Sequence, residues 1–272
     1  MGWYTHTEGD STTARGTYSH AEGGYTTAEG DYSHVEGYKT IAIGDGAHAE
    51  GYRYGTGATQ NFGPYANGQG AHAEGATTSA FCKGAHAEGR STHRATEICT
   101  SLPDLIDDTK IKSGAWDTIK SAWDNKKFSL AIGEAAHSEG VNTIACQYAH
   151  AEGEQTIAYG SKSHAEGTKT QANGISSHAE GEGTIVNKRC QHVQGKYNIE
   201  DTSSNTYGKY AHIVGNGDST TPSNAHTLDW SGNAWFAGSI TANNMILKEN
   251  YAYGDSFPSD PQNGQIFFFK VQ

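Results

Sequence analysis

The chain of 272 residues is short of the residues that build a large apolar core or a basic surface. It has only 5 Pro and 2 Met, and hydrophobic residues make up 35% of it. A chain this poor in Leu, Ile and Val does not build one large hydrophobic core, so an ordinary globular enzyme is not indicated. The formal net charge is -11, and the clustered Lys and Arg that recognise phosphate are lacking. This excludes general nucleic-acid binding and disfavours docking on an anionic membrane.

Cysteine motifs and long apolar runs are also missing. No C-x-x-C spacing occurs, so neither a zinc knuckle nor a redox pair is indicated, and we expect buried thiols at Cys82, Cys99, Cys146 and Cys190. No stretch approaches the roughly 18 apolar residues of a membrane helix, and the first residues do not form an apolar signal region. We therefore expect no membrane insertion by these residues.

What the chain does have is 35 Gly, 15 Tyr and a repeat. The sequence His-x-Glu-Gly recurs at intervals of 14 residues, with one step of 13 and two longer gaps, and ends as His-x-Gln-Gly. The histidines are His6, His20, His34, His48, His72, His86, His137, His150, His164, His178 and His192. Such self-similarity is typical of a solenoid.

Half a period after the first motif comes a second one, Thr-x-Ala-x-Gly, as at Thr40 to Gly44. Each 14-residue unit therefore contains two short strands closed by turns, and we interpret it as one coil. Side chains alternate along a strand, so Ala47 and Ala49 share one face and His48 and Glu50 the other. Small residues suit the inside of a narrow roll. Ile41 and Ile43 lie opposite Thr40 and Ala42, and packing inside the coil or against a neighbour stays open for them.

The recurrent glycines fit corners that need a positive φ or a close backbone approach. Coils stacked at the usual strand spacing place like residues in ladders, and about fifteen coils would give a rod on the order of 70 Å long. Such a thin roll buries little by itself and is stabilised by its neighbours, so we expect an obligate oligomer, with threefold symmetry suiting a fibre.

The 14-residue, twice-glycine repeat resembles the left-handed parallel β-roll in the heads of trimeric autotransporter adhesins. The sequence motif Ser-His-Ala-Glu-Gly, at Ser163 to Gly167 and Ser177 to Gly181, is more similar to motifs of phage and prophage tail-fibre or neck-appendage proteins. The stretches 191–198 and 224–238 resemble the region that enters the autoprocessing chaperone domain of such proteins. The resemblance covers roughly residues 1–91 and 128–240 and implies an all-β, left-handed parallel β-solenoid that forms a homotrimer.

Two interruptions divide the chain. We predict β-roll repeats over 1–91, a partly helical insertion over 92–127, a second block of repeats over 128–195 and a C-terminal β region for trimerisation over 196–272. The 51 residues from His86 to His137 leave about 23 to 37 outside the roll, by the period alone. Trp116 and Trp123 either pack the insertion onto the rod or form an aromatic platform for a receptor.

Beyond residue 195, turn signals at Asn216 to Asp218 and Ser231 to Asn233 predict a hairpin with strands over 227–230 and 234–237. The last residues, 264–272, are the most apolar segment, and we expect them to be buried in a trimeric foot or tip.

The paired His and Glu side chains are the main candidates for chemistry. They could ligate a metal, but a site needs three or four converging ligands, whereas a repeated ladder indicates architecture, so no cofactor is predicted. We assign a structural ladder in which Glu accepts hydrogen bonds from His or from backbone N–H groups. Its members include His20, Glu22, His34, Glu36, His48, Glu50, His164, Glu166, His178 and Glu180.

Catalytic motifs are lacking: there is no Gly-x-Ser-x-Gly elbow and no P-loop. A glycan depolymerase or a self-cleaving fibre protein stays an alternative, since Asp104, Asp107, Asp108, Asp117 and Asp124 cluster in the insertion, although a solvated helix face explains them.

The sequence thus predicts a non-enzymatic structural and host-recognition protein. The first hypothesis is a trimeric phage or prophage tail-fibre or appendage segment on a virion, and the alternative is the head of a bacterial surface adhesin. Its partners would be two further copies of itself, a cell-surface glycan or protein receptor, and other virion or surface proteins.

Overall fold

The computed structural model describes residues 2–53, 63–90, 129–239, 252–253 and 267–268. It divides into two units, residues 1–237 and 238–272. The described residues are all-β and contain no helix. The second unit holds one strand pair, β25 (Ala252–Tyr253) and β26 (Phe267–Phe268), which are parallel. The predictions for the partly helical insertion and for most of the segment 264–272 lie outside the described residues.

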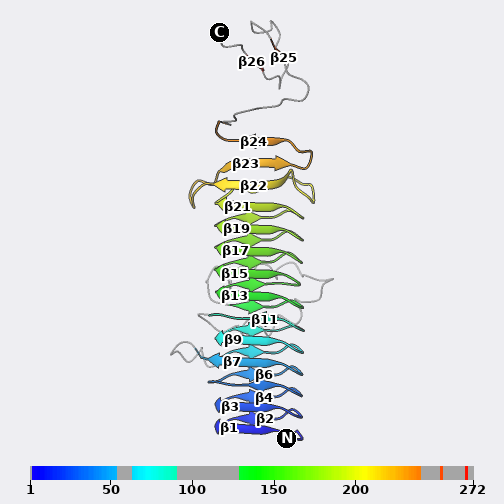
Figure 1. Ribbon diagram of the computed structural model, residues 1–272, viewed down its shortest axis with the longest axis vertical. Coiled ribbons are helices and arrows are strands. Elements are labelled where there is room, and N and C mark those ends of the chain that lie inside the picture. Colours follow the sequence, from blue (N-terminus) through cyan, green and yellow to red (C-terminus); the bar gives the residue numbers. More distant parts are fainter. Residues whose placement is uncertain (1, 54–62, 91–128, 240–251, 254–266, 269–272) are drawn as a thin grey trace. The chain divides into compact units, whose positions relative to one another are not determined.

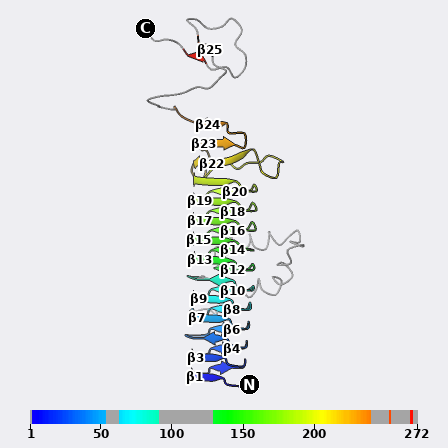
Figure 2. The ribbon, with the colours of Figure 1, turned by 45° about the vertical axis from the view of Figure 1, so that its right-hand side comes forward.

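The first unit is a parallel β-solenoid, as the repeat predicted, and it has about ten coils. Figures 1 and 2 show its strands stacked one above another in chain order, from β1 to β21. Each coil contributes a strand with the His-x-Glu-Gly sequence to one sheet and a short strand to a second sheet. Every pairing within the coils is parallel and in register, so His20 pairs with His34 and Ala28 with Ala42.

The first sheet comprises β1 (His6–Asp10), β3 (His20–Gly24), β5 (His34–Val35), β7 (His48–Tyr52), β9 (His72–Ala76), β11 (His86–Ala87), β13 (His137–Val141), β15 (His150–Glu154), β17 (His164–Thr168), β19 (His178–Glu182), β21 (His192–Lys196), β22 (Tyr210–Asn216), β23 (Asn224–Asp229) and β24 (Ala234–Phe236). The second sheet comprises β2 (Thr13–Ala14), β4 (Thr27–Ala28), β6 (Ile41–Ala42), β8 (Tyr65–Ala66), β10 (Ser79–Ala80), β12 (Leu130–Ala131), β14 (Ile144–Ala145), β16 (Ile157–Ala158), β18 (Gln171–Ala172) and β20 (Ile185–Val186).

The coil number is lower than the expected fifteen because neither long gap in the repeat adds a coil. His48 pairs directly with His72, and His86 with His137. This register uses one 14-residue turn of the 51 residues, so 37 are not needed for the stack, the upper of the two values that the period allowed. The 13-residue step to His150 also keeps the register, so the missing residue is absorbed in the turn between β14 and β15.

Alanine columns fill the inside of the roll. Ala21, Ala49 and Ala73 in the first sheet and Ala28 and Ala42 in the second are fully buried. The alternation predicted for residues 47–50 is confirmed, because both alanines are buried while His48 and Glu50 are half-buried. Thr40 is buried as well, so Ile41 and Ile43 lie on the outside of their coil, whereas Ile144 and Ile157, in the same column of the second sheet, are fully buried.

Buried hydroxyl groups are satisfied locally at several corners. The Thr40, Thr78 and Thr184 hydroxyls donate to the carbonyls of Glu36, Glu74 and Glu180, each four residues earlier. Ser19, Ser33 and Ser177, just before the histidines, donate to the glycine carbonyl three residues earlier at 2.6–2.7 Å. These bonds close several of the coils without apolar bulk.

The coils have two kinds of corner with a positive φ, and only one of them requires glycine. The glycine of His-x-Glu-Gly has a φ near +100°, as at Gly153 (φ +105°), and a Cβ there would lie 2.2 Å from the carbonyl oxygen of Gly167. This confirms the expected role of that glycine. A left-handed conformation also occurs at corner residues that are not glycine, including Tyr18, Lys162 and Cys190.

The cysteines match the expectation of buried thiols only in part. Cys82 and Cys146 are half-buried, and burial raises the pKa of their thiols to about 11 and about 12. Cys190 is exposed and lies at a left-handed corner, two residues before His192. Cys99 lies outside the described residues.

The solenoid ends in an antiparallel extension. β22 pairs in parallel with β21 and then antiparallel with β23, which pairs antiparallel with β24. The predicted hairpin at Ser231 to Asn233 is confirmed. Asp201 stabilises this transition: its carboxylate accepts hydrogen bonds from the backbone N–H groups of Ser203, Lys209 and Tyr210. Burial alone would raise the pKa of Asp201, but these N–H groups hold it below its ordinary value.

Candidate functional site

The outward face of the first sheet carries the predicted ladder as two parallel columns, one of histidines and one of glutamates. We call it the His–Glu face. It contains His6 to His192 of the repeat and the glutamates two residues after them, Glu8, Glu22, Glu36, Glu50, Glu74, Glu88, Glu139, Glu152, Glu166 and Glu180. The register of β1 to β19 places each glutamate beside the glutamate of the next coil.

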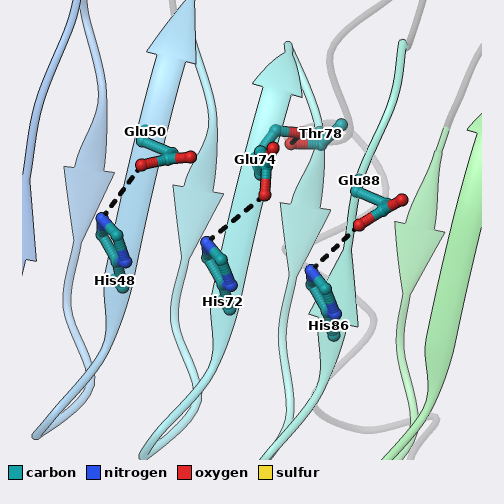
Figure 3. Close-up of polar contacts among 7 residues, drawn as sticks. All are labelled: His48, Glu50, His72, Glu74, Thr78, His86 and Glu88. Atoms are coloured by element: carbon teal, nitrogen blue, oxygen red, sulfur yellow. Dashed lines mark hydrogen bonds and ion pairs between the residues drawn. The ribbon is translucent and has the colours of Figure 1, made fainter.

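Within one coil, the histidine and glutamate side chains point toward each other (Figure 3). The distance from Nε2 to Oε2 is 3.5 Å for His48 and Glu50 and for His86 and Glu88, and 3.9 Å for His72 and Glu74. The pairs nearer the C-terminus are similar, at 3.7 to 4.0 Å. These are ion-pair distances rather than short hydrogen bonds.

The imidazole rings stack along the column. Ring centroids of neighbouring coils are 4.7 Å apart from His48 to His72, from His72 to His86 and from His86 to His137. The rings in these three pairs are parallel to within 1–4°. The column ends at His212 and His226, where the contacts become tilted and edge-on.

Burial favours the neutral form of several histidines in the column. It lowers the pKa of His86 and His192 to about 4, and the neighbouring imidazoles of the column, which would repel a second positive charge, lower it further. The same two causes, in the same order, lower the pKa of His48, His150 and His178.

The Nε2 atoms of the column are buried and have no hydrogen-bond partner among the described residues. This holds for His20, His34, His48, His72, His86, His137, His150, His164, His178 and His192. The predicted hydrogen bond from histidine to glutamate is therefore not formed at Nε2, and the role assigned to the ladder stays a prediction. Neighbouring coils bring together sets of three potential metal ligands, such as His72, Glu74 and His86. The ligand atoms of each set all lie within 4.8 Å of one another.

A second column, of tyrosines, lies at the corner two residues before the histidines. Tyr4, Tyr18 and Tyr32 stack with centroids 5.1 and 5.2 Å apart and are 73%, 52% and 67% exposed. All three have φ near +59°, a conformation that bulky residues rarely adopt. The same corner holds Gly46, Gly70 and Gly84 in later coils, so the fold does not require tyrosine there. Sequence reasoning missed this column, although the 14-residue spacing of its tyrosines was a usable signal.

Exposed aromatic residues also gather on the C-terminal extension. Trp230, Trp235 and Phe236 are 44–54% exposed. Trp235 lines an open hollow of about 1000 Å³, together with Tyr210, Asp229 and Asn233. The predicted receptor residues Trp116 and Trp123 lie outside the described residues, as do the five clustered aspartates of the insertion.

Comparison with protein families finds the YadA head domain repeat in two copies, at residues 36–53 and 125–145. This is the β-roll repeat of trimeric autotransporter adhesins. The first match lies in the first block of the solenoid, and the second runs into the second block. A search of curated proteins finds no match. The described part of the chain has no helix with the length and apolar character needed to span a membrane.

Proposed function

We propose that the chain is the head of a trimeric, adhesin-type protein on a bacterial surface, in which the solenoid holds a receptor-binding surface away from the cell. The observation that carries this proposal is the YadA head repeat in both blocks of one continuous stack of coils. YadA-type adhesins form homotrimers, bind surface receptors and are adhesive rather than enzymatic. The alternative function predicted from the sequence is thus better supported than the first hypothesis.

The thin core supports the trimer. The inward positions are mostly Ala, Ser and Thr, so each coil removes little apolar surface from water, and burial between copies adds what a single roll lacks. Sedimentation equilibrium tests this directly, because three copies of 29.0 kDa give about 87 kDa. A mass of 29.0 kDa at micromolar concentration would contradict the trimer.

The tyrosine column is the receptor contact that we propose within the described residues. It exposes aromatic surface, which is enriched at protein interfaces, in a backbone conformation that glycine adopts at lower cost in the same column. The platform of Trp116 and Trp123 remains a second proposed contact.

The binding test uses labelled protein on intact animal and bacterial cells and on a glycan array. We expect the variant Tyr4→Gly, Tyr18→Gly, Tyr32→Gly to lose at least ~10-fold in binding. The control is Tyr148→Gly, at the same corner of a coil without a tyrosine neighbour. A second variant lacks residues 92–127. If neither variant differs from the unchanged protein, both proposed contacts are wrong.

A phage or prophage tail-fibre segment is the second candidate, and the sequence motif Ser-His-Ala-Glu-Gly favours it. Gene context discriminates the two candidates: a signal peptide and membrane anchor in the full gene favour the adhesin, and neighbouring tail and capsid genes favour the phage. Release of reducing sugar from a glycan would instead support a depolymerase, and a shortened chain on a denaturing gel would support autoprocessing.

A further inference from the structure

The His–Glu face combines a column of imidazole nitrogens with a column of carboxylates. Its glutamates follow one another at the strand spacing of about 4.8 Å, where like charges repel. The histidines beside them hold Nε2 atoms 3.5–4.0 Å from these carboxylate oxygens. A cation bound on this face would offset the repulsion between carboxylates.

The buried Nε2 atoms are a second, independent observation. Polar atoms that are removed from water normally have a partner, and one without a partner calls for an explanation such as a bound ion. Ten successive coils leave Nε2 buried and unpartnered among the described residues, and the nearest carboxylate oxygen, where one is within ion-pair range, is 3.5 Å or more away. The separation is too long for a good hydrogen bond but suits two ligands that share one ion.

We propose that the His–Glu face binds divalent transition-metal ions of the zinc class, each ion held by the histidine and glutamate of one coil and by the histidine of the next. Imidazole nitrogen and carboxylate oxygen are both common Zn²⁺ ligands, at about 2.0–2.2 Å. Two such ligands on a tetrahedral ion are ~3.4 Å apart. The Nε2 to Oε2 distance of 3.5 Å at His86 and Glu88 is close to this value.

The second histidine must turn to complete the site. Stacked rings 4.7 Å apart point their nitrogens in parallel, and an imidazole binds a metal in the plane of its ring. A rotation of one ring about its Cβ–Cγ bond directs its Nε2 toward the ion. Since the ligand atoms of His72, Glu74 and His86 already lie within 4.8 Å of one another, no backbone movement is needed. Water completes the tetrahedron, as in sites with three protein ligands.

Sharing of histidines limits the number of ions. His86 belongs both to the set with His72 and Glu74 and to the set with Glu88 and His137. One Nε2 lone pair binds one ion, so alternate sets fill. Sets that share no histidine are His72, Glu74, His86; His137, Glu139, His150; and His164, Glu166, His178. These sets correspond to about three ions per chain in the described residues.

The test is equilibrium dialysis of the full chain against micromolar ZnCl₂ at pH 7.5, with bound zinc measured by mass spectrometry. We expect about three ions per chain. The variant Glu74→Gln, Glu139→Gln, Glu166→Gln keeps side-chain size and should bind at least ~10-fold more weakly. The matched control, Glu29→Gln, Glu182→Gln, Glu200→Gln, removes three carboxylates outside the His–Glu face and should bind as the unchanged protein does.

Electron paramagnetic resonance with Cu²⁺ identifies the ligands independently, and we expect hyperfine splitting from imidazole nitrogen. Circular dichroism of each variant verifies that the coils are intact. Less than one zinc ion per unchanged chain would overturn the proposal. So would equal loss of zinc from the two triple variants, since this would indicate nonspecific binding to acidic residues, and so would a copper spectrum without nitrogen splitting.

Discussion

The side-chain amide of Asn198 pairs with the backbone of Ile185 as a further strand would. Its Oδ1 accepts a hydrogen bond from the Ile185 N–H at 2.8 Å, and its Nδ2 donates to the Ile185 carbonyl at 3.0 Å. Ile185 belongs to β20, the last strand of the second sheet, whose outer edge has no following strand among the described residues. Asn198 takes the column position of Thr184 one coil later, and there its amide satisfies an edge that would otherwise be free to pair with another chain.

We predict that Asn198→Ala destabilises the C-terminal coils. Asn198 is 5% exposed, so its removal leaves a donor and an acceptor of Ile185 unsatisfied in a poorly hydrated place. The expected cost is about 1–3 kcal/mol of unfolding free energy, measured by urea denaturation. The control is Asn187→Ala. Asn187 is an exposed asparagine that directly follows β20, and its replacement should change the unfolding free energy by less than about 0.5 kcal/mol. Equal effects of the two substitutions would show that the amide pairing contributes nothing.

Gly153→Ala and Gly46→Ala distinguish two reasons for glycine, a close backbone contact and a positive φ. Both glycines have a positive φ, +105° and +65°. At Gly153 a Cβ would lie 2.2 Å from the Gly167 carbonyl oxygen, whereas at Gly46 nothing lies within 4 Å. Ala135 already occupies the column of Gly46 with φ 48°. We therefore expect a loss of about 3 kcal/mol or more for Gly153→Ala and about 1 kcal/mol for Gly46→Ala. Comparable melting temperatures for the two variants would contradict this.

The sequence was sufficient to predict the coil, but it was not sufficient to predict the ends of the solenoid or the residues at its corners. A strict period of 14 residues fixes which side chains stack, so the alanine columns and the His–Glu face followed from His48 and its neighbours alone. The period does not tell which residues of an interruption leave the stack, and the coil number was therefore overestimated. Asn198 lies where the repeat weakens, so its capping role depends on a contact with Ile185 that no spacing reveals.

The corners were missed for a different physical reason. A left-handed backbone is disfavoured for residues with a Cβ, so sequence reasoning assigns such corners to glycine. In this solenoid, Tyr18 and Cys190 occupy them because the stacked backbone above and below fixes the turn regardless of the side chain. Their exposure follows from the same geometry.

Replacement of the tyrosine column should separate binding from stability. Tyr18→Gly relieves a left-handed conformation that costs about 1 kcal/mol, but it removes ring contacts with Tyr4 and Tyr32 and makes the unfolded chain more flexible. These effects oppose each other, so we expect the unfolding free energy to change by less than about 1 kcal/mol. Thermal melting with and without the substitution measures it. A loss of about 3 kcal/mol would instead assign the column a structural role.

Acidification should destabilise the solenoid between pH 6.5 and pH 4. The folded-state pKa of His86 and of His192 is about 4, below the ordinary value of 6.5, mainly because of burial. The unfolded chain therefore binds more protons in this range. The stability that these histidines contribute is present above pH 6.5, is lost as the pH falls toward 4, and changes no further below that pH. The rings are about one-third exposed, so solvent reduces the effect of each ring, and burial lowers the pKa of His48, His150 and His178 in the same direction.

We expect the melting temperature to fall by roughly 5 °C from pH 7 to pH 4.5, measured by circular dichroism in metal-free buffer. His86→Gln removes one of these rings and should reduce the loss between pH 6.5 and 4.5. A melting temperature that stays constant down to pH 4.5 would contradict the assignment of neutral, buried imidazoles to the column.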